Sequence, residues 1–452
     1  MMRKSLRLPV LLAVIGVLAL GWWLAKPKTR FTYGLQPVSQ HSAILLTRHN
    51  SRDATYFWVE HVADDGKLLW SREVSPFRPA DALEFSGIAA TEDRVVLLGK
   101  GPDGTGKAMA LATTTGELLW ETVLGSDPFS ARIGRMLILD NSRVYVFFDQ
   151  IVDEEEVVNS VCAVSLSNGQ VLWSRTIEDA SPGYKPIVLA PDRLVVPKSN
   201  HQYTEVDGAT GKELRDLPIE RVGCEIPEGL LGYAGQELIP ISRAGVPTHI
   251  ALPDKAHGTW RGPCGVHRTP EASDDYVIGI QGKTASMIKF PASGGSPVWQ
   301  LDLGTTNFED SASQMGVLPR FLPVIVTTAE GNDVLVVDLD RGNLVSREPI
   351  PLGSSVFVGP ERGYVLTFDS HLHTLNPADG SLEKVMHLQG LSSRHVRSED
   401  YQFGTLWLEG NGWATPGELP WVNLDIASGQ ISARPPVVLS DQTARGWKPP
   451  SY

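Results

Sequence analysis

Few side chains in this 452-residue sequence have the types and spacing that catalysis or metal binding requires. His371 and His373 could both face a metal ion, because residues two apart on a β-strand point to the same face. No third ligand can be placed near them, so we favour an ordinary exposed strand face. The sequence contains neither a phosphate-binding glycine loop nor a nucleophile with a base at a recognisable spacing. We therefore expect no catalytic, metal-binding or cofactor-binding residues.

An acidic run, Asp153-Glu154-Glu155-Glu156, lies between a β-type segment that ends near Phe148 and one that begins near Val161. We expect these acids at the tip of a long hairpin loop, where water solvates them. A calcium site or a contact with a basic partner is the alternative.

The net charge of the chain is −12, and its distribution excludes nucleic acid as a partner. The first thirty residues carry six basic side chains and no acid, so the remaining residues carry −18. A body this acidic repels a phosphate backbone. We expect a monomer that binds proteins, whose identity the composition does not indicate.

The apolar segment Leu8 to Ala25 has no charged residue and is long enough to cross a bilayer as a helix. Trp22 and Trp23 stand where an interfacial belt is expected, and bulky residues before Ala25 are atypical of a cleavage site. We predict an uncleaved signal-anchor after a cytoplasmic tail of residues 1–7; a cleaved signal peptide is the alternative. The rest of the chain then lies on the periplasmic side of a bacterial inner membrane.

The chain repeats a β-hairpin in which a turn glycine is followed four residues later by tryptophan. The stretch L-A-T-T-T-G-E-L-L-W-E from Leu111 is the clearest copy. Glycine suits this turn because it adopts a positive φ without strain. The repeat glycines are Gly66, Gly116, Gly169, Gly211, Gly295, Gly342, Gly380 and Gly429, and the tryptophans are Trp70, Trp120, Trp173 and Trp299.

Runs of β-branched residues after short polar turns precede these hairpins, as in E-D-R-V-V-L-L from Glu92, and no window shows convincing helical periodicity. The glycines are 38 to 53 residues apart, except for one step of 84 residues. This step contains a degenerate repeat at Gly232 to Pro253, which lacks the tryptophan. This spacing is typical of four-stranded propeller blades. We expect an all-β propeller of about eight blades over residues 41–440, with seven or nine as alternatives. A tether at 26–40 precedes it, and a tail at 441–452 follows.

Three cysteines are too few for a disulfide-dense scaffold, and they lack the spacing of a metal site. Cys162 lies in the run V-C-A-V-S-L, whose small apolar residues are typical of a packed strand, so we expect a buried thiol. Cys224 and Cys264 flank the degenerate repeat, where the repeat signal is weakest. We predict a disulfide between them, since such a bond persists outside the cytoplasm. Two thiols that never meet are the alternative.

The pattern A-x-D-x-x-x-G-x-x-x-W resembles the PQQ-like β-propeller repeat, which quinoprotein dehydrogenases share with BamB-type factors of outer-membrane protein assembly. The aspartate four residues before the glycine is kept at Asp207, Asp338 and Asp425, whereas Arg215 and Ser346 replace two of the tryptophans. The resemblance covers nearly everything after the tether, and it implies that the tryptophans pack between neighbouring blades. A stacking platform for a sugar or a quinone is the alternative.

The dehydrogenase branch of this family holds its quinone with an adjacent cysteine pair and a calcium ion bound by Glu, Asn and Asp side chains. No two cysteines are adjacent in this sequence, so the resemblance implies no quinone cofactor and no enzymatic activity. We expect a membrane-anchored scaffold for protein partners in cell-envelope or outer-membrane protein assembly. The alternative is a small-molecule sensor, or a degenerate quinoprotein-like enzyme, with a site in the central channel.

Overall fold

The computed structural model describes the chain in segments between residues 29 and 433. The described residues are 29–39, 41–50, 55–63, 67–76, 78–79, 87–103, 105–125, 136–139, 142–153, 156–177, 187–190, 192–198, 202–227, 229–242, 249–252, 259–268, 274–309, 316–359, 362–369, 371–387, 405–409, 421–425 and 431–433. The predicted cytoplasmic tail (1–7), signal-anchor (8–25) and carboxyl-terminal tail (441–452) lie outside them. Within these ranges, no helix has the length and apolar character that crossing a membrane requires.

The regular elements of the described residues are β-strands, as the missing helical periodicity predicts. Strands that follow one another in the chain pair antiparallel, because short turns join them, and they form nine sheets in the described residues. The first sheet contains β1 (Thr29–Ser39), β2 (Ser42–Asn50), β3 (Thr55–Ala63) and β4 (Leu68–Glu73). The second contains β5 (Arg78–Pro79), β6 (Ile88–Ala90), β7 (Arg94–Lys100), β8 (Gly106–Ala112) and β9 (Leu118–Gly125). The third contains β10 (Met136–Leu139), β11 (Arg143–Asp153), β12 (Glu156–Ser165) and β13 (Val171–Ile177).

The next three sheets cover the middle of the chain. The fourth sheet contains β14 (Ile187–Ala190), β15 (Arg193–Pro197), β16 (Tyr203–Asp207) and β17 (Glu213–Leu217). The fifth contains β18 (Arg221–Ile226), β19 (Gly229–Ala234), β20 (Glu237–Ser242) and β21 (Ile250–Ala251). The sixth contains β22 (Thr259–Arg268), β23 (Asp274–Gln281), β24 (Ala285–Pro291) and β25 (Trp299–Asp302), with β27 (Val317–Leu318) added parallel to β22.

Three further sheets complete the series. The seventh contains β26 (Asn307–Phe308), β28 (Phe321–Thr327), β29 (Asn332–Asp338) and β30 (Asn343–Ile350). The eighth contains β31 (Ser355–Val358), β32 (Gly363–Leu366), β33 (His371–Leu375) and β34 (Leu382–His387). The ninth contains β35 (Thr405–Glu409), β36 (Trp421–Asp425) and β37 (Ile431–Ala433).

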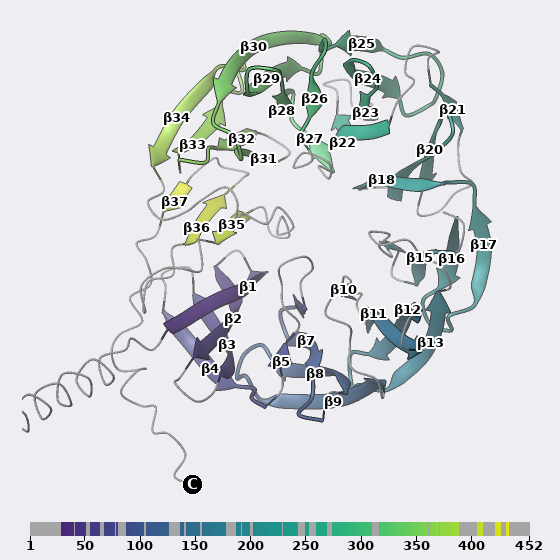
Figure 1. Cartoon of the computed structure of the whole chain (residues 1–452), viewed down its shortest axis with the longest axis vertical. Coiled ribbons are helices and arrows are strands. Elements are labelled where there is room, and N and C mark those ends of the chain that lie inside the picture. Colours follow the sequence, from purple (N-terminus) through teal and green to yellow (C-terminus); the bar gives the residue numbers. More distant parts are fainter. Residues whose placement is uncertain are drawn as a thin grey trace, which may run out of the picture.

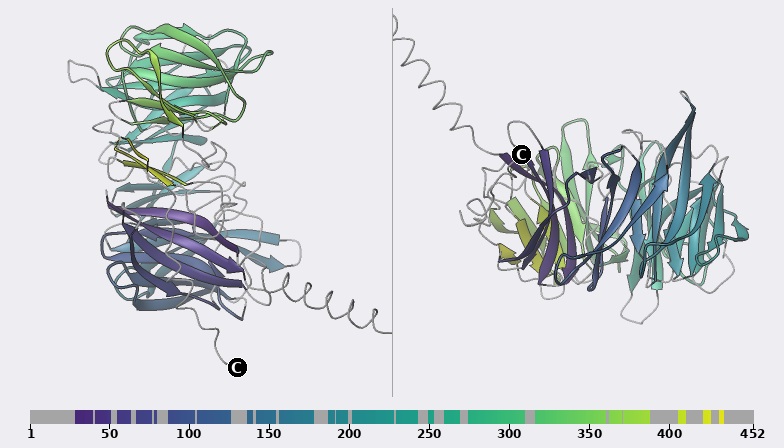
Figure 2. Two further views of the ribbon diagram at one scale, coloured as in Figure 1. Left: turned by 90° about the vertical axis from the view of Figure 1, so that its left-hand side faces the viewer. Right: turned by 90° about the horizontal axis from the view of Figure 1, so that it is seen from below.

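The sheets follow one another in chain order around a ring, and β35–β37 lie between the eighth sheet and the first (Figure 1). Strands β9, β17 and β30 run along the outer rim of this ring. Figure 2 shows the ring from two sides, as a flat body in which neighbouring sheets stand face to face. The fold is therefore an all-β propeller. Its blade number stays a prediction, because the strands of the ninth sheet are separated by stretches outside the described residues.

The hydrophobic core lies between consecutive sheets. One cluster of buried side chains combines Val96 and Ala110 of the second sheet with Val144 and Cys162 of the third. Another combines Val277 and other side chains of the sixth sheet with those of the seventh and eighth. Each of the first eight sheets thus buries an apolar face against a neighbouring sheet, which a single hairpin cannot do.

Two strand boundaries differ from the sequence-based expectation. Residues 29–39, assigned to a tether, form β1, which pairs with β2, and Val38 is buried in the same cluster as Ile44. The propeller therefore begins at the tether, because this strand covers a sheet edge that would otherwise be open. Strands β11 and β12 also run up to the acidic run, where Asp153 pairs with Glu156. The acids thus lie at the end of the hairpin as predicted, but the prediction of a long loop was wrong, since the valines and isoleucine flanking these acids favour strand.

Candidate functional site: the junctions between neighbouring sheets

The hairpin between the third and fourth strands of a sheet has the same backbone at five of the six repeat glycines that the structure describes. Its glycine has a φ of 69° to 77°, which favours glycine over every other residue. The glycine N–H donates to the carbonyl four residues earlier, at 2.7 to 2.9 Å. The glycines with this geometry are Gly116, Gly169, Gly211, Gly342 and Gly380, whereas Gly295 has a φ of 109° and Gly66 and Gly429 lie outside the described residues.

Each repeat tryptophan contacts the hairpin of the next sheet along the chain. Trp120, on β9 of the second sheet, is buried, and its indole N–H donates to the carbonyl of Leu166 in the third sheet at 2.9 Å. A Cβ added to Gly169 would lie 2.8 Å from the same indole ring, closer than real contacts allow. Gly169 is thus required for two reasons: its φ is positive, and the indole ring packs directly against its backbone.

The same relation recurs at three other junctions, a junction being the contact between two consecutive sheets. In each, the accepting carbonyl stands three residues before the turn glycine. The Trp70 indole N–H donates to the Thr113 carbonyl at 2.6 Å, beside Gly116. The Trp173 indole N–H donates to the Gly208 carbonyl at 2.9 Å, beside Gly211. The Trp299 indole N–H donates to the Leu339 carbonyl at 3.0 Å, beside Gly342. These three tryptophans are partly buried. We call these four contacts the tryptophan junctions.

A β-bulge directs each tryptophan of the first three sheets toward the next sheet. Leu111 pairs with Leu118 and Ala110 with Trp120, so Leu119 is left without a partner on β8. The unpaired residue just before the tryptophan is Leu69 in the first sheet and Leu172 in the third. These three leucines are exposed, at 46%, 46% and 42% in chain order. A bulge bends an edge strand, which re-aims its side chains and hinders pairing with another sheet.

The repeat aspartates stabilise the hairpin turns. The Oδ1 atom of Asp207 accepts hydrogen bonds from the backbone N–H groups of Ala209 and Thr210, at 3.1 and 2.8 Å. The hydrogen bond from the Thr210 hydroxyl lowers the pKa of Asp207 most, and the hydrogen bond from the Thr210 backbone N–H lowers it further. Asp338 accepts from the N–H of Asp340 at 3.0 Å. The side chain of Asp425 is outside what the structure describes.

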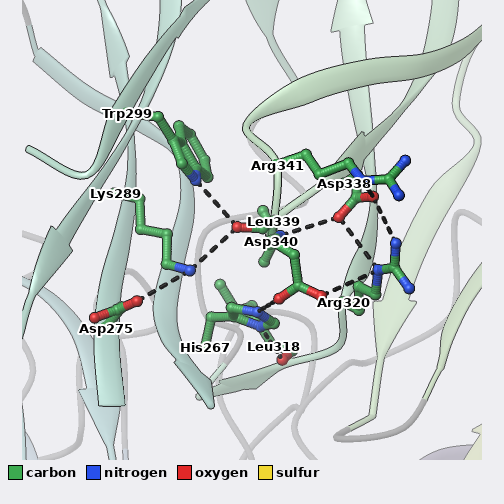
Figure 3. Close-up of polar contacts among 10 residues, drawn as sticks. All are labelled: His267, Asp275, Lys289, Trp299, Leu318, Arg320, Asp338, Leu339, Asp340 and Arg341. Carbon is green, nitrogen blue, oxygen red and sulfur yellow. Dashed lines mark hydrogen bonds and ion pairs between the residues drawn. The ribbon is translucent and has the colours of Figure 1, made fainter. Parts of the chain in front are cut away.

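The junction between the sixth and seventh sheets adds a buried polar network to its tryptophan contact (Figure 3). Lys289 is 2% exposed, and its Nζ lies 3.0 Å from the carboxylate of Asp275. The same Nζ donates to the Leu339 carbonyl at 3.2 Å, so this carbonyl accepts from both Lys289 and Trp299. The sequence does not indicate this network, because Lys289 is a single charged residue inside a mainly apolar strand.

The second part of the network surrounds the turn before Gly342. The Nε2 atom of buried His267 lies 2.9 Å from Oδ1 of Asp340, whose Oδ2 lies 3.2 Å from Arg320 (Figure 3). Arg320 also binds the buried carboxylate of Asp338 at 2.9 Å. Burial on its own raises the pKa of Asp338, but hydrogen bonds from Arg320 and the backbone outweigh it and lower the pKa. Each charge is compensated by a partner, which is what a buried ionic group requires.

The junctions that lack tryptophan use other contacts. Arg215, which replaces the tryptophan of the fourth sheet, binds the buried carboxylate of Glu205 at 2.6 Å within its own sheet. At the eighth sheet, Gly380 faces the ring of Phe321, which comes from the inner strand β28. Ser346 therefore does not take over the role of the tryptophan that it replaces.

The three cysteines lie in two different settings. A disulfide joins Cys224 on β18 to Cys264 on β22, with the two Cα atoms 5.9 Å apart, and so links the fifth sheet to the sixth. Cys162 is a free, buried thiol on β12, and burial raises its pKa to about 12. Such a thiol is not a nucleophile at neutral pH.

A pocket of about 780 Å³ lies at the rim between the second and third sheets. It is lined by the turn Thr91 to Arg94, by Ser142 and Arg143, by the hairpin Ser165 to Ser167, and by Leu172. The Arg94 guanidinium donates to the Leu166 carbonyl at 2.5 Å, and the Arg143 guanidinium binds Asp192 at 2.8 Å. The wall of this pocket therefore carries hydroxyls, two guanidiniums, the carboxylates of Glu92 and Asp93, and two leucines. The polar turns E-D-R and N-S-R are the sequence signal of this site, although nothing in the sequence shows that they meet.

The described residues contain no group of three or more histidine, cysteine or acidic side chains placed to hold a metal ion. His371 and His373 lie on β33, both partly buried. The nearest partner of His371 in sequence is Asp369, whose carboxylate lies 2.9 Å from its Nδ1.

Comparison with known proteins identifies the repeat. The family described as outer membrane protein assembly factor BamB matches residues 57–223. BamB from Moraxella catarrhalis is 14% identical over 79% of this chain and 88% of that chain, with a TM-score of 0.39. The quinohemoprotein alcohol dehydrogenase from Comamonas testosteroni is 11% identical over 86% of this chain and 72% of that chain, with a TM-score of 0.43. No curated protein matches the sequence. The repeated hairpins and the family match both support a PQQ-like β-propeller repeat over residues 57–223.

Proposed function

We propose that the protein is a non-enzymatic, membrane-anchored scaffold that binds protein partners in cell-envelope or outer-membrane protein assembly. The observation that carries this proposal is the use made of its charged and aromatic side chains. The four repeat tryptophans and the network around Lys289 and Arg320 make contacts between sheets, and these contacts hold the ring together. The family match to an outer-membrane assembly factor supports the same conclusion.

The rim offers surface for a partner. The bulged leucines Leu69, Leu119 and Leu172 project into solvent, and Leu172 also lines the pocket beside Arg94 and Arg143. An apolar side chain beside cationic and hydroxyl groups can bury a partner residue and bond its polar end. We place the partner's contact at this part of the rim.

The proposed location is the periplasmic face of the inner membrane. The apolar segment Leu8 to Ala25 supplies the anchor, and no acid in the first thirty residues opposes its insertion. The disulfide between Cys224 and Cys264 agrees with an oxidising compartment.

Affinity purification from membranes tests the proposal. The bait is the full-length chain with a carboxyl-terminal tag, either unchanged or carrying Leu172→Asp in the pocket. The matched control is Leu352→Asp, since Leu352 is 68% exposed and precedes the eighth sheet, away from the pocket. We expect an envelope protein to co-purify with the wild type and with Leu352→Asp, and to be depleted with Leu172→Asp. Recovery of no envelope protein beyond that of an unrelated anchored bait would contradict the scaffold.

A further inference from the structure

The eighth sheet brings a third histidine to the pair on β33. His371 and His387 are partners across the antiparallel strands β33 and β34, so their side chains stand on the same face. Their ring centroids are 4.8 Å apart, and the ring planes are inclined at 40°. Sixteen positions separate the two in the sequence, and a register shift between Leu372 and His373 sets the pairing, which is why sequence spacing alone does not reveal it.

One of the two imidazoles is held in a defined orientation. The Oδ2 atom of Asp369 lies 2.9 Å from Nδ1 of His371, and Oδ1 of Asp369 accepts from the Thr367 hydroxyl at 2.5 Å. The same hydroxyl oxygen accepts from the backbone N–H of His371 at 3.1 Å. A carboxylate on Nδ1 fixes the proton there and leaves the Nε2 lone pair for another partner. Metal-binding histidines are oriented by a carboxylate in this way.

The position is accessible from solvent. The His371 side chain is partly exposed, and His387 is exposed on the outer strand β34. His373 lies two residues along the same strand, but its cross-strand partner is Lys384, whose ammonium group repels a cation. Together with the lack of any three-ligand group in the described residues, this limits the protein ligands to two imidazoles.

We propose that His371 and His387 bind one divalent transition-metal ion of the class of Zn²⁺, Ni²⁺ and Cu²⁺, with water completing its coordination. Imidazole nitrogen suits these ions, whereas Mg²⁺ and Ca²⁺ prefer oxygen ligands. Asp369 is a positioning residue that orients His371. The site is independent of the protein-binding role, because it lies on the eighth sheet and the pocket lies between the second and third.

Isothermal titration calorimetry with Zn²⁺ on the untagged full-length chain in detergent tests the site. We expect His371→Ala and His387→Ala each to remove one saturable Zn²⁺ binding event, and Asp369→Asn to weaken it about 10- to 100-fold. The matched control is His249→Ala, because His249 also pairs with a carboxylate, that of Glu237 at 2.7 Å, on another sheet. This control should bind Zn²⁺ as the wild type does.

Two further readouts separate the site from simple structural damage. All four variants should keep a melting temperature close to that of the wild type without metal, since Asp369, His387 and His249 are exposed and His371 is partly exposed. Mg²⁺ should produce no binding at this site in any of them. The proposal is overturned if the wild type binds no Zn²⁺, if His371→Ala and His387→Ala bind it as the wild type does, or if His249→Ala loses binding equally.

Discussion

The tryptophan junctions and the two junctions of the fifth sheet hold neighbouring sheets together by different chemistry. At the tryptophan junctions, an indole from one sheet packs on a glycine of the next and donates to a carbonyl three residues before it. The fourth sheet has Arg215 at the tryptophan position, and this arginine binds Glu205 in its own sheet. The fifth sheet is instead tied to the sixth by the disulfide between Cys224 and Cys264.

The difference shows what a closed ring of weakly similar repeats requires. Apolar packing between sheets is non-directional, so it does not by itself fix how far one sheet slides on the next. The indole contact fixes that position because one ring must meet one glycine and one carbonyl. A disulfide fixes the relative position of two sheets equally well where the repeat has lost its tryptophan. The following predictions test this comparison.

The largest effect is expected at a tryptophan junction. Trp120→Ala removes a buried indole and leaves a cavity beside Gly169, which should lower the free energy of unfolding by about 3–5 kcal/mol. The control Leu118→Ala concerns a side chain that is 45% exposed two positions earlier, and it should have little effect. Chemical denaturation monitored by circular dichroism measures both. Equal losses for the two variants would contradict the role of the indole.

Removal of the disulfide should come next. The bond closes a loop of 40 residues, for which the chain-entropy argument gives about 4 kcal/mol as an upper figure. We expect the double variant Cys224→Ser/Cys264→Ser to unfold at lower denaturant concentration, with hydrogen exchange rising first in the fifth sheet. Non-reducing mass spectrometry of the exported wild type should find a peptide joining the two cysteines. Three thiols that all react with an alkylating reagent would rule the bond out.

A smaller effect is expected from a methyl group on the hairpin glycine. Gly169→Ala forces a positive φ on alanine and pushes its Cβ into the Trp120 ring. Gly235→Ala is the matched control, because Gly235 has a φ of 55° and nothing within 4 Å of an added Cβ. Both variants should lose about 1–2 kcal/mol for the backbone, and Gly169→Ala should lose a further 1–3 kcal/mol or so for the clash. Equal melting temperatures would show that the ring does not press on the glycine.

The smallest effect concerns acid stability at the network between the sixth and seventh sheets. The folded-state pKa of Asp338 is lowered, so its carboxylate stabilises the fold above the usual aspartate pKa of about 3.9. This contribution is lost as the pH falls through the lowered pKa. We expect Asp338→Asn to flatten the fall of the melting temperature between about pH 5 and pH 2, relative to the wild type. Glu330→Gln, at an exposed residue between β28 and β29, is the control, and a wild-type slope in Asp338→Asn contradicts the prediction.

The repeat itself could be predicted from sequence because its signal is local. The turn glycine and the tryptophan are four residues apart, and β-branched runs mark the strands between. The family resemblance implies that the indole packs between blades, but the carbonyl that it meets could not be predicted, since Trp120 and its acceptor Leu166 are 46 residues apart and no local pattern joins them. The bulge before the tryptophan was missed for the same reason, because cross-strand register decides it.

Side chains that depend on register or on several sheets were the hardest to predict. The network around Asp338 gathers His267 from β22, Lys289 from β24 and Arg320 from the segment before β28, each an unremarkable residue in its own segment. His387 opposite His371 depends on a register shift that the sequence does not mark. The acidic residues at the tips of β11 and β12 predict a loop, but the flanking β-branched residues favour strand and extend the two strands to Asp153 and Glu156.

A double-mutant cycle between Trp120 and Gly169 tests most directly whether the indole and the glycine hold neighbouring sheets together. Unfolding free energies are measured for the wild type, Trp120→Ala, Gly169→Ala and the double variant. The ring that meets the added methyl group is absent in Trp120→Ala, whereas Thr122 Oγ1, 2.7 Å from the added Cβ, is present in both backgrounds. Gly169→Ala should therefore cost less free energy of unfolding in Trp120→Ala than in the wild type. We predict a coupling energy of about 1–3 kcal/mol between the two sites. Costs that add to within about 0.5 kcal/mol would contradict the contact as the link between the sheets.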